Sequence, residues 1–264
     1  MPRFSAHVGY LFTDRPLLER FAAAAAVGFK AVDMPACYEA PAAALKEAVA
    51  RSGVTPLGIN TPRHFEKAPH GLAALPGREK DWDASFAMAL DYATAIGNNS
   101  IHCMAGIVDD GERAQAEKTF LANLRRAADL AAEKKLRLNI EPINPYDAPG
   151  YFLRSVEQAA DIIAKAGKPN ICIQFDFYHV QIVGGDLIRR LEKNLSLVGH
   201  LQCAQVPVRS EPDIGEVNYP FVFSEVDRLG YKGWIGAEYF PRAGTEEGLG
   251  WARAYGIEAK GQSR

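Results

Sequence analysis

The chain has 264 residues, of which 48% are hydrophobic, and it carries a formal net charge of −2. This length is sufficient for a large core, either in one α/β barrel or in two smaller domains. A charge near zero and a pI near 6.3 do not indicate binding to nucleic acid or to an anionic membrane.

Four cysteines occur in or beside predicted strands, and none belongs to a Cys-x-x-Cys motif. We expect them to be small core residues of a protein in the reducing cytoplasm. The first five residues contain no apolar run of the signal-peptide kind. The alanine run at residues 22–26 is shorter than the ~20 residues that cross a bilayer, so no membrane span is expected.

In the first half of the chain, short apolar stretches alternate with Ala-rich amphipathic segments. Strands are predicted at residues 4–10, 30–34, 54–60 and 100–104. Helices are predicted at residues 16–27, 41–51 and 79–96, and each is followed by a glycine of the kind that ends helices. Residues 61–78, rich in Pro, Gly and His, predict a long loop over an active face.

The same alternation continues to the C-terminus. Further strands are predicted at residues 136–141, 171–176, 197–202 and 234–238, and helices at residues 112–134, 156–166, 186–194, 220–229 and 245–255. Ser155 and Asn218 are the expected N-caps of the helices at 156–166 and 220–229. Residues 203–218 form a second long loop, and residues 258–264 a polar tail that we expect to fray.

Eight strand–helix units therefore follow one another without a break in composition. The alternation predicts a parallel sheet covered by helices, and eight units predict closure into a (β/α)8 TIM barrel. The alternative is a doubly wound open sheet, which usually carries a Gly-rich first turn that is absent here. We predict a single domain at residues 1–257.

The stretch at residues 136–141 alternates between apolar and polar side chains. Its apolar positions, such as Leu138 and Ile140, should face the helices, as should the equivalent Ile173, Phe175, Leu201 and Ile235 of later strands. Its polar positions, Asn139 and Glu141, should then point into the barrel, with Gln174, Asp176, His200, Gln202 and Glu238 of later strands. Active sites of barrels lie at the C-terminal ends of the strands, so a polar inner face there indicates a functional mouth.

Four successive strands end on an oxygen-bearing side chain: Glu141, Asp176, Gln202 and Glu238. Two unit charges 4 Å apart repel by about 4 kcal/mol at an effective dielectric constant of 20, so carboxylates this close must protonate or share a cation. Oxygen ligands favour Mg²⁺ or Mn²⁺ over zinc. The alternative is a set of carboxylates that line the barrel and pair with arginines.

Several motifs resemble those of the hydroxypyruvate isomerase family of xylose isomerase-like TIM barrels. They are Ile140-Glu141-Pro142-Ile143-Asn144, Gln174-Phe175-Asp176-Phe177-Tyr178-His179, Gly199-His200-Leu201-Gln202 and Gly233-Trp234-Ile235-Gly236-Ala237-Glu238-Tyr239. The resemblance extends over nearly the whole chain. It implies that Glu141 and Glu238 are the catalytic pair, and that Glu141, Asp176, Gln202 and Glu238 hold the metal ion.

The implied reaction converts hydroxypyruvate to tartronate semialdehyde (2-hydroxy-3-oxopropanoate). A proton leaves C3, an enediolate forms, and a proton returns at C2, with one glutamate as base and the other as acid. The divalent cation would act as a Lewis acid on the carbonyl group. The residues do not indicate which glutamate is the base.

Five further residues are candidate substrate contacts. His179 lies three residues after Asp176 at a position that lines the site in the family, and His200 shares the inward phase of Gln202 one layer deeper. Asn60 and His102 end the third and fourth strands, and Arg209 in the second long loop is the expected partner of the substrate carboxylate.

Two departures from the family pattern leave the substrate open. Asp33 stands where the family usually has Glu, and Phe240 stands where it usually has Lys. Alternatives of the same fold are a 2-oxo-tetronate isomerase, which moves the same proton on a four-carbon acid, and a ketose 3-epimerase.

Two other classes of protein fit the sequence less well. A hydrolase like endonuclease IV needs a His-rich rim with several metal ions and a basic DNA-binding face, whereas the six histidines here are expected mostly away from strand ends. A non-catalytic binding barrel would keep ligand affinity without turnover. The sequence leaves a homo-oligomer open, since Phe221, Phe223 and Trp251 could lie in an interface or in the core.

Overall fold

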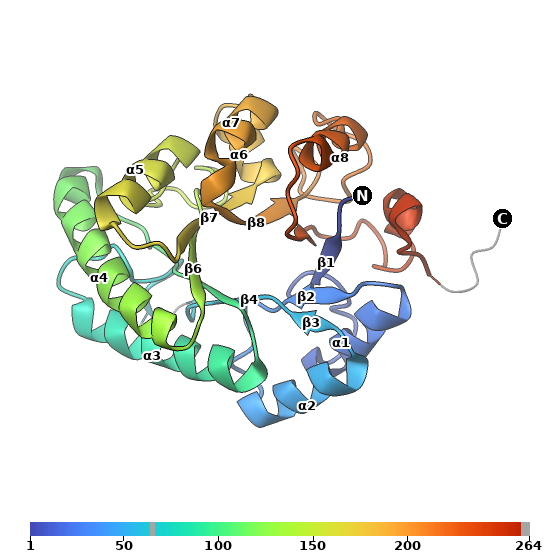
Figure 1. Cartoon of the computed structure of the whole chain (residues 1–264), viewed down its shortest axis with the longest axis horizontal. Helices are drawn as coiled ribbons and strands as arrows, with labels where there is room; N and C mark the ends of the chain where they lie inside the picture. Colours follow the sequence, from blue (N-terminus) through green and yellow to red (C-terminus); the bar gives the residue numbers. More distant parts are fainter. Residues whose placement is uncertain (64–66, 260–264) are drawn as a thin grey trace.

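Nine parallel strands form a ring at the centre of the computed structural model, which describes residues 1–63 and 67–259 (Figure 1). The strands are β1 (Phe4–His7), β2 (Ala31–Asp33), β3 (Thr55–Pro56), β4 (Gly58–Asn60), β5 (Ser100–His102), β6 (Arg137–Ile140), β7 (Ile171–Asp176), β8 (Val198–Cys203) and β9 (Ile235–Ala237). Their order is β3-β2-β1-β9-β8-β7-β6-β5-β4, so neighbours in the sheet are neighbours in the sequence except where the last strand, β9, pairs with the first, β1. The single-domain TIM barrel is confirmed, while residues 260–264 of the predicted tail lie outside the described residues.

The predicted third strand is divided at Leu57, which gives nine strands in place of eight. The Leu57 N–H donates to the Val32 carbonyl at 2.9 Å, and the Met34 N–H donates to the Gly58 carbonyl at 3.0 Å, so this segment bonds to β2. The Asn99 N–H donates to the Leu57 carbonyl at 2.8 Å, and β4 then pairs with β5. One bent segment therefore joins the two ends of the strand order and closes the ring.

Helices surround this ring (Figure 1). The described α-helices are α1 (Leu17–Ala26), α2 (Ala42–Ser52), α3 (Glu79–Ile96), α4 (Arg113–Glu133), α5 (Val156–Ala166), α6 (Phe177–Val183), α7 (Leu187–Asn194) and α8 (Tyr219–Arg228). Short 3-10 helices are η2 (Asp110–Glu112), η3 (Leu195–Leu197) and η4 (Leu249–Tyr255). None of the described helices is long and apolar enough to span a membrane.

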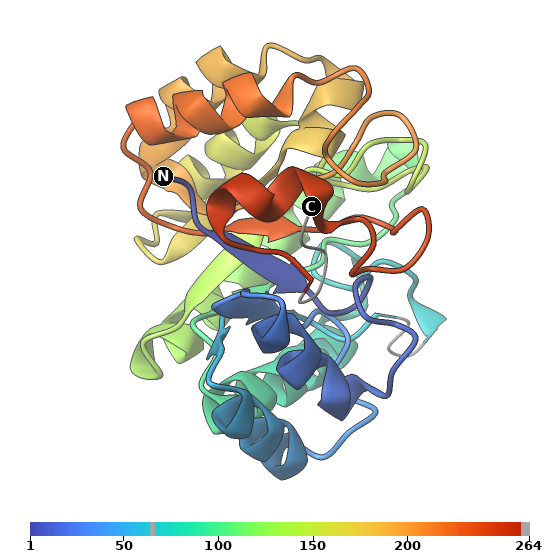
Figure 2. The same cartoon turned by 90° about the vertical axis from the view of Figure 1, so that its right-hand side faces the viewer.

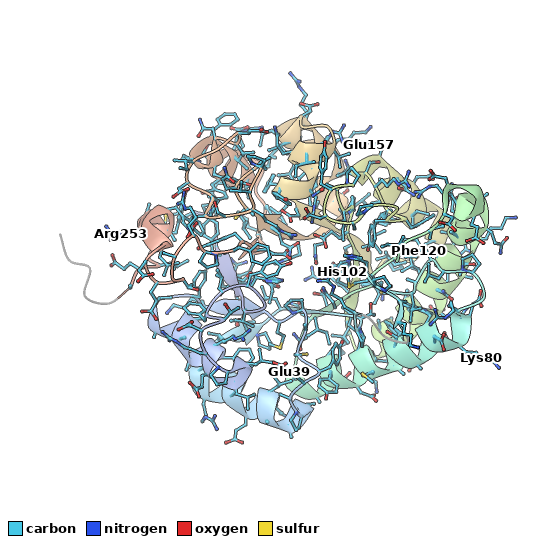
Figure 3. The ribbon with its side chains drawn as sticks, turned by 180° about the vertical axis from the view of Figure 1, so that it is seen from behind. Glu39, Lys80, His102, Phe120, Glu157 and Arg253 are labelled. Carbon is cyan, nitrogen blue, oxygen red and sulfur yellow. The ribbon has the colours of Figure 1, made fainter. Side chains whose placement is uncertain are left out.

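The long loops that follow the strands gather at one end of the barrel, as the side view in Figure 2 shows. Seen from behind, His102 lies within the ring, whereas Lys80, Glu157 and Arg253 lie on the outer surface (Figure 3). The loop end is the C-terminal end of the parallel strands, where barrel enzymes carry their active sites.

The predicted caps of two helices are confirmed. Ser155 Oγ accepts from the Gln158 N–H at 3.1 Å and begins α5, which ends at Gly167 in the left-handed conformation. Asn218 Oδ1 accepts from the Phe221 N–H at 3.3 Å and begins α8. In both helices the local sequence and the tertiary fold therefore agree.

Two elements differ from the prediction. Helix α6 follows β7 directly, with Asp176 as its N-cap, and its apolar sequence lacks the amphipathic period that would predict a helix. The last predicted helix is a 3-10 helix that starts only at Leu249, because Gly244 and Gly248 occupy its expected first turn.

The two faces of the strands separate as predicted. The apolar residues of the outward face belong to the buried hydrophobic core; they are Leu138, Ile140, Ile173, Phe175, Leu201 and Ile235. Asn139, Gln174 and Gln202 line a small polar cavity inside the ring, of about 10 Å³, which has room for about one water molecule. The interior of the barrel is thus polar, and its apolar core lies between strands and helices.

Candidate active site

A cavity of about 620 Å³ opens at the C-terminal ends of the strands. Among the predicted site residues, Glu141, Glu238, His179, Arg209, Asn60 and His102 line it. A second cavity of about 430 Å³ lies beside it, and Tyr10 and Phe240 line both cavities with their rings 4.3 Å apart. This aromatic pair separates the two spaces.

Three buried side chains meet at one side of the larger cavity. Glu141 follows β6, Asp176 ends β7, and His179 lies in the first turn of α6. One potential ligand atom from each lies within 4.8 Å of the other two. His179 enters this group because α6 begins immediately after β7 and turns its side chain back over the strand ends.

Glu141 is held by side chains from neighbouring strands. Its Oε2 accepts a hydrogen bond from Gln174 Nε2 at 3.0 Å and lies 3.5 Å from His102 Nδ1. Its Oε1 lies 4.0 Å from His179 Nε2 and has no hydrogen-bond partner among the described residues. One carboxylate oxygen is therefore fixed, and the other is available to a ligand.

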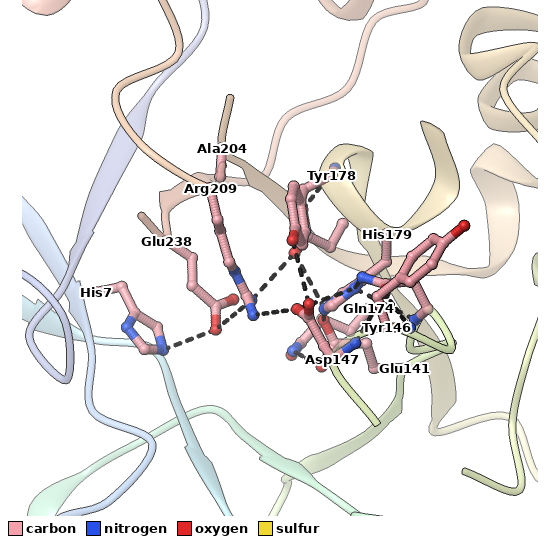
Figure 4. A network of polar contacts seen from close by, with 12 residues as sticks. His7, Glu141, Tyr146, Asp147, Gln174, Tyr178, His179, Ala204, Arg209 and Glu238 are labelled. Atoms are coloured by element: carbon pink, nitrogen blue, oxygen red, sulfur yellow. Dashed lines mark hydrogen bonds and ion pairs between the residues drawn. The ribbon is translucent and has the colours of Figure 1, made fainter. Parts of the chain in front are cut away.

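Glu238 lies on the other side of the mouth, between β1 and the loop that follows β8. Its Oε1 is 3.4 Å from His7 Nε2 and 3.1 Å from Arg209 Nη2 (Figure 4). Its Oε2 is buried and has no partner among the described residues. Both predicted catalytic glutamates thus border one cavity.

The guanidinium of Arg209 is enclosed by acids and aromatic rings. Besides Glu238, it pairs with Asp147 Oδ2 at 3.0 Å and lies 3.6 Å from Asp176 Oδ2. The rings of Tyr10 and Tyr178 lie on either side, at 5.3 and 4.9 Å from its central carbon. Such cation–π contacts stabilise a buried arginine, and the surrounding acids keep its pKa above the usual value.

Burial shifts the pKa values of the acids and histidines in opposite directions. Burial, Glu238 and Asp176 raise the pKa of Glu141 well above its usual value. Burial and Glu238 raise the pKa of Asp176 to about 7, although Arg209 opposes the change. Burial also lowers the pKa of His102 to about 3 and that of His179 well below its usual value, so both are neutral near pH 7. Their contacts with the carboxylates are therefore not ion pairs.

Two of the predicted metal ligands, Glu141 and Asp176, lie with His179 in a group that could hold a metal ion, whereas Glu238 does not belong to this group. Each of the four predicted ligands carries a buried oxygen without a hydrogen-bond partner among the described residues: Glu141 Oε1, Asp176 Oδ2, Gln202 Oε1 and Glu238 Oε2. Buried polar atoms are normally satisfied, and His7, His102 and Arg209 around the same cavity also carry a buried nitrogen without a partner among the described residues. An all-oxygen set is of the kind that Mg²⁺ or Mn²⁺ prefers, and His179 could add a nitrogen ligand.

Two predicted residues lie deeper in the barrel than the cavity. Gln202 lines the small polar cavity within the ring. His200 Nε2 lies 3.3 Å from Asp33 Oδ1, and Asp33 Oδ2 accepts from the Ser5 hydroxyl at 2.5 Å. The carboxylate of Asp33 thus contacts the buried His200 deeper in the barrel than the cavity.

Several residues at the site were not predicted from the sequence. His7 lines the cavity because β1 ends at His7, three residues before its predicted end. Of the described histidines, His7 and His102 end strands. Asp147 and Tyr178 were also missed, and the Tyr178 hydroxyl donates to Asp147 Oδ1 at 3.2 Å. A signal was present for Tyr178, which lies between the predicted Asp176 and His179.

Comparison with known proteins places the chain in a family. Residues 21–255 match the family model described as xylose isomerase-like TIM barrel. A protein of Cupriavidus necator named 2-oxo-tetronate isomerase is 47% identical over 97% of this chain and 99% of its own length. A human protein named putative hydroxypyruvate isomerase is 42% identical over 96% of this chain and 95% of its own length.

A solved structure has the same architecture. The crystal structure of a protein from Brucella melitensis titled AP endonuclease, family 2, superimposes with a TM-score of 0.94 at 39% identity. The match covers 97% of this chain and 99% of that one. The chain therefore belongs to the family of xylose isomerase-like TIM barrels, an enzyme family in which its close relatives are named isomerases.

Proposed function

We propose that this enzyme isomerises a short hydroxy-2-oxo acid by moving a proton between two adjacent carbon atoms. The observation that carries the proposal is the set of four unpartnered oxygens, one on each predicted metal ligand, with both glutamates on the wall of one cavity. Two carboxylates on either side of a small substrate are the arrangement that removal and return of a proton require.

The roles of the side chains follow from their surroundings. Glu141, Asp176, Gln202 and Glu238 would hold Mg²⁺ or Mn²⁺, which when bound polarises the substrate carbonyl group as a Lewis acid. In this proposal Glu141 removes the proton and Glu238 returns it, and burial raises the pKa of both. His102 and His179 are neutral and could donate hydrogen bonds to substrate oxygens.

Asn60 and Arg209 line the same cavity and are the other proposed substrate contacts. The neutral side-chain amide of Asn60 can both donate a hydrogen bond to a substrate hydroxyl group and accept one from it. His200 lies below, against Asp33, and its proposed role is to support the residues of the mouth.

Two substrates are candidates. The C. necator relative is named for the four-carbon 2-oxo-tetronate, and its 47% identity makes this our first choice. The human relative is named for hydroxypyruvate, the three-carbon acid that the sequence motifs favoured. In both acids a proton would move between the carbonyl carbon C2 and the hydroxyl-bearing C3.

A substrate panel tests the proposal. We would measure turnover of 2-oxo-tetronate, hydroxypyruvate and free ketoses with Mn²⁺, with Mg²⁺ and with a chelator, and include DNA with an abasic site as the hydrolase arm. We expect turnover of an acid that the chelator abolishes. Equal activity in the chelator would refute the metal-assisted mechanism, and cleavage of the DNA alone would refute the isomerase assignment.

Two further predictions concern the cellular location of the protein and its association with other copies. All four cysteines are free in the structure, which supports the proposed cytoplasmic location. Phe223 is buried in the core, whereas Phe221 is exposed, so only Phe221 of this pair remains a candidate for an interface between copies.

A further inference from the structure

A carboxylate substrate needs a cation that is not already paired with protein acids. Arg209 does not meet this condition, because Asp147, Glu238 and Asp176 lie 3.0, 3.1 and 3.6 Å from its guanidinium (Figure 4). Moving Arg209 to a substrate would leave the buried Asp176 and Glu238 without their counter-charge, which is costly.

One other arginine lines the cavity. Arg63 follows β4, is exposed to solvent at the mouth, and has its Nη2 3.5 Å from His70 Nδ1. Among residues 1–63 and 67–259, no carboxylate forms an ion pair with Arg63, whereas three acids surround Arg209. Its donors are therefore available to a ligand in the cavity.

Arg63 and Arg209 lie on opposite sides of the barrel. In the strand order, β5, β6 and β7 separate β4 from β8 in one direction, and β9, β1, β2 and β3 separate them in the other. Glu141 and Asp176 follow β6 and β7, between the two arginines. A short acid with its carboxylate at Arg63 would therefore extend across the mouth toward the proposed metal ligands.

The charge of Arg63 also reaches the site. It lowers the pKa of His102, after the larger effect of burial, and it acts in the same direction on Glu238.

We infer that Arg63 binds the carboxylate group of the substrate and so orients its hydroxy-oxo end toward Glu141 and Glu238. This inference rests on the proposed function, since it assumes an acid substrate. It assigns Arg209 a different task, which is to neutralise the acids of the metal site and hold them in place. The guanidinium of Arg63 can take a carboxylate through two parallel hydrogen bonds, which a lysine cannot do.

The test compares acids with a neutral ketose in four variants: Arg63→Gln, Arg63→Lys, Arg209→Gln and Arg15→Gln. Arg15 is the matched control, because it lines only the neighbouring cavity and pairs with Glu246. We expect Arg63→Gln to raise KM for 2-oxo-tetronate and hydroxypyruvate about 10- to 100-fold, as loss of a charged hydrogen bond does, with kcat little changed. Kinetics with the neutral ketose erythrulose should not change, Arg63→Lys should lie between, and Arg15→Gln should match the wild type.

A binding measurement separates this inference from the proposed reaction. D-glycerate has no ketone or aldehyde group to react. Isothermal titration calorimetry should show that it binds more weakly to Arg63→Gln than to the wild type, while binding of neutral glycerol should not change. If the wild type turns over no acid but glycerate binding depends on Arg63, the reaction is wrong and the carboxylate site stands. If Arg63→Gln affects acid and ketose equally, or only Arg209→Gln weakens glycerate binding, the inference is overturned.

Discussion

The substitution Asp176→Asn should stabilise the protein in a chelator while it removes a metal ligand. Asp176 is buried, and its pKa is raised from 3.8 to about 7 by burial and by Glu238. A difference of this size means that the ionised carboxylate costs the folded state about 4 kcal/mol above pH 7. Asparagine keeps the side-chain oxygen that caps α6 through the Tyr178 N–H, and Asn is as good an N-cap as Asp.

The pH dependence gives the sign of the effect. An acid whose pKa is raised by folding destabilises the folded state increasingly as pH rises from its ordinary value through the raised one. The advantage of the variant should therefore grow between about pH 4 and pH 7 and stay constant above. The measurement is the free energy of unfolding in urea, with EDTA, at pH 5 and pH 8.

Asp147→Asn is the matched control. Asp147 is partly exposed and pairs with Arg209 at 3.0 Å, so the same chemical change should destabilise the protein. The reasoning is refuted if Asp176→Asn is no more stable than the wild type at pH 8, or if its advantage is the same at both pH values. Added Mn²⁺ should stabilise the wild type and have little effect on Asp176→Asn.

Three other substitutions test separate parts of the structure. Glu141→Gln keeps the size of the side chain but loses the proposed base, and kcat measured with Mn²⁺ should fall about 10²- to 10⁴-fold; a loss of less than tenfold would argue against this role. Arg209→Gln leaves buried acids without their cation, and urea unfolding in EDTA should show a loss of about 3–5 kcal/mol, part of which Mn²⁺ restores. An unchanged stability would mean that these ion pairs contribute nothing. Ser155→Ala removes the cap of α5, which does not line the cavity, and should cost about 1 kcal/mol of stability with kcat unchanged; a change in kcat would show that α5 is coupled to the site.

The fold could be predicted because its elements repeat one pattern. Each helix with an amphipathic period and a cap, such as α3 or α5, was placed to within a residue or two. The elements that the sequence did not reveal lack that pattern: α6 is short and has no amphipathic period, and the third strand changes its bonding partner at Leu57. In such segments tertiary contacts determine the conformation.

The predicted metal ligands share a phase on parallel strands, and strand ends meet at one rim. This reasoning locates Glu141, Asp176 and Glu238 at one mouth, but it does not predict which loop residues reach the site. Asp147 and Arg63 approach the site through segments without periodicity, so no spacing rule reveals them. The charge balance of a site is therefore harder to predict from sequence than its ligands.

The contact between the rings of Tyr10 and Phe240 has a consequence for how this enzyme could acquire new substrates. A small side chain at position 240 would merge the two adjoining cavities into one elongated trough. Room for longer carbon chains would then come from one substitution, with the proton-transfer machinery left untouched. Because only a few side chains lie between the two cavities, the length of the substrate would be an easily altered property of the barrel.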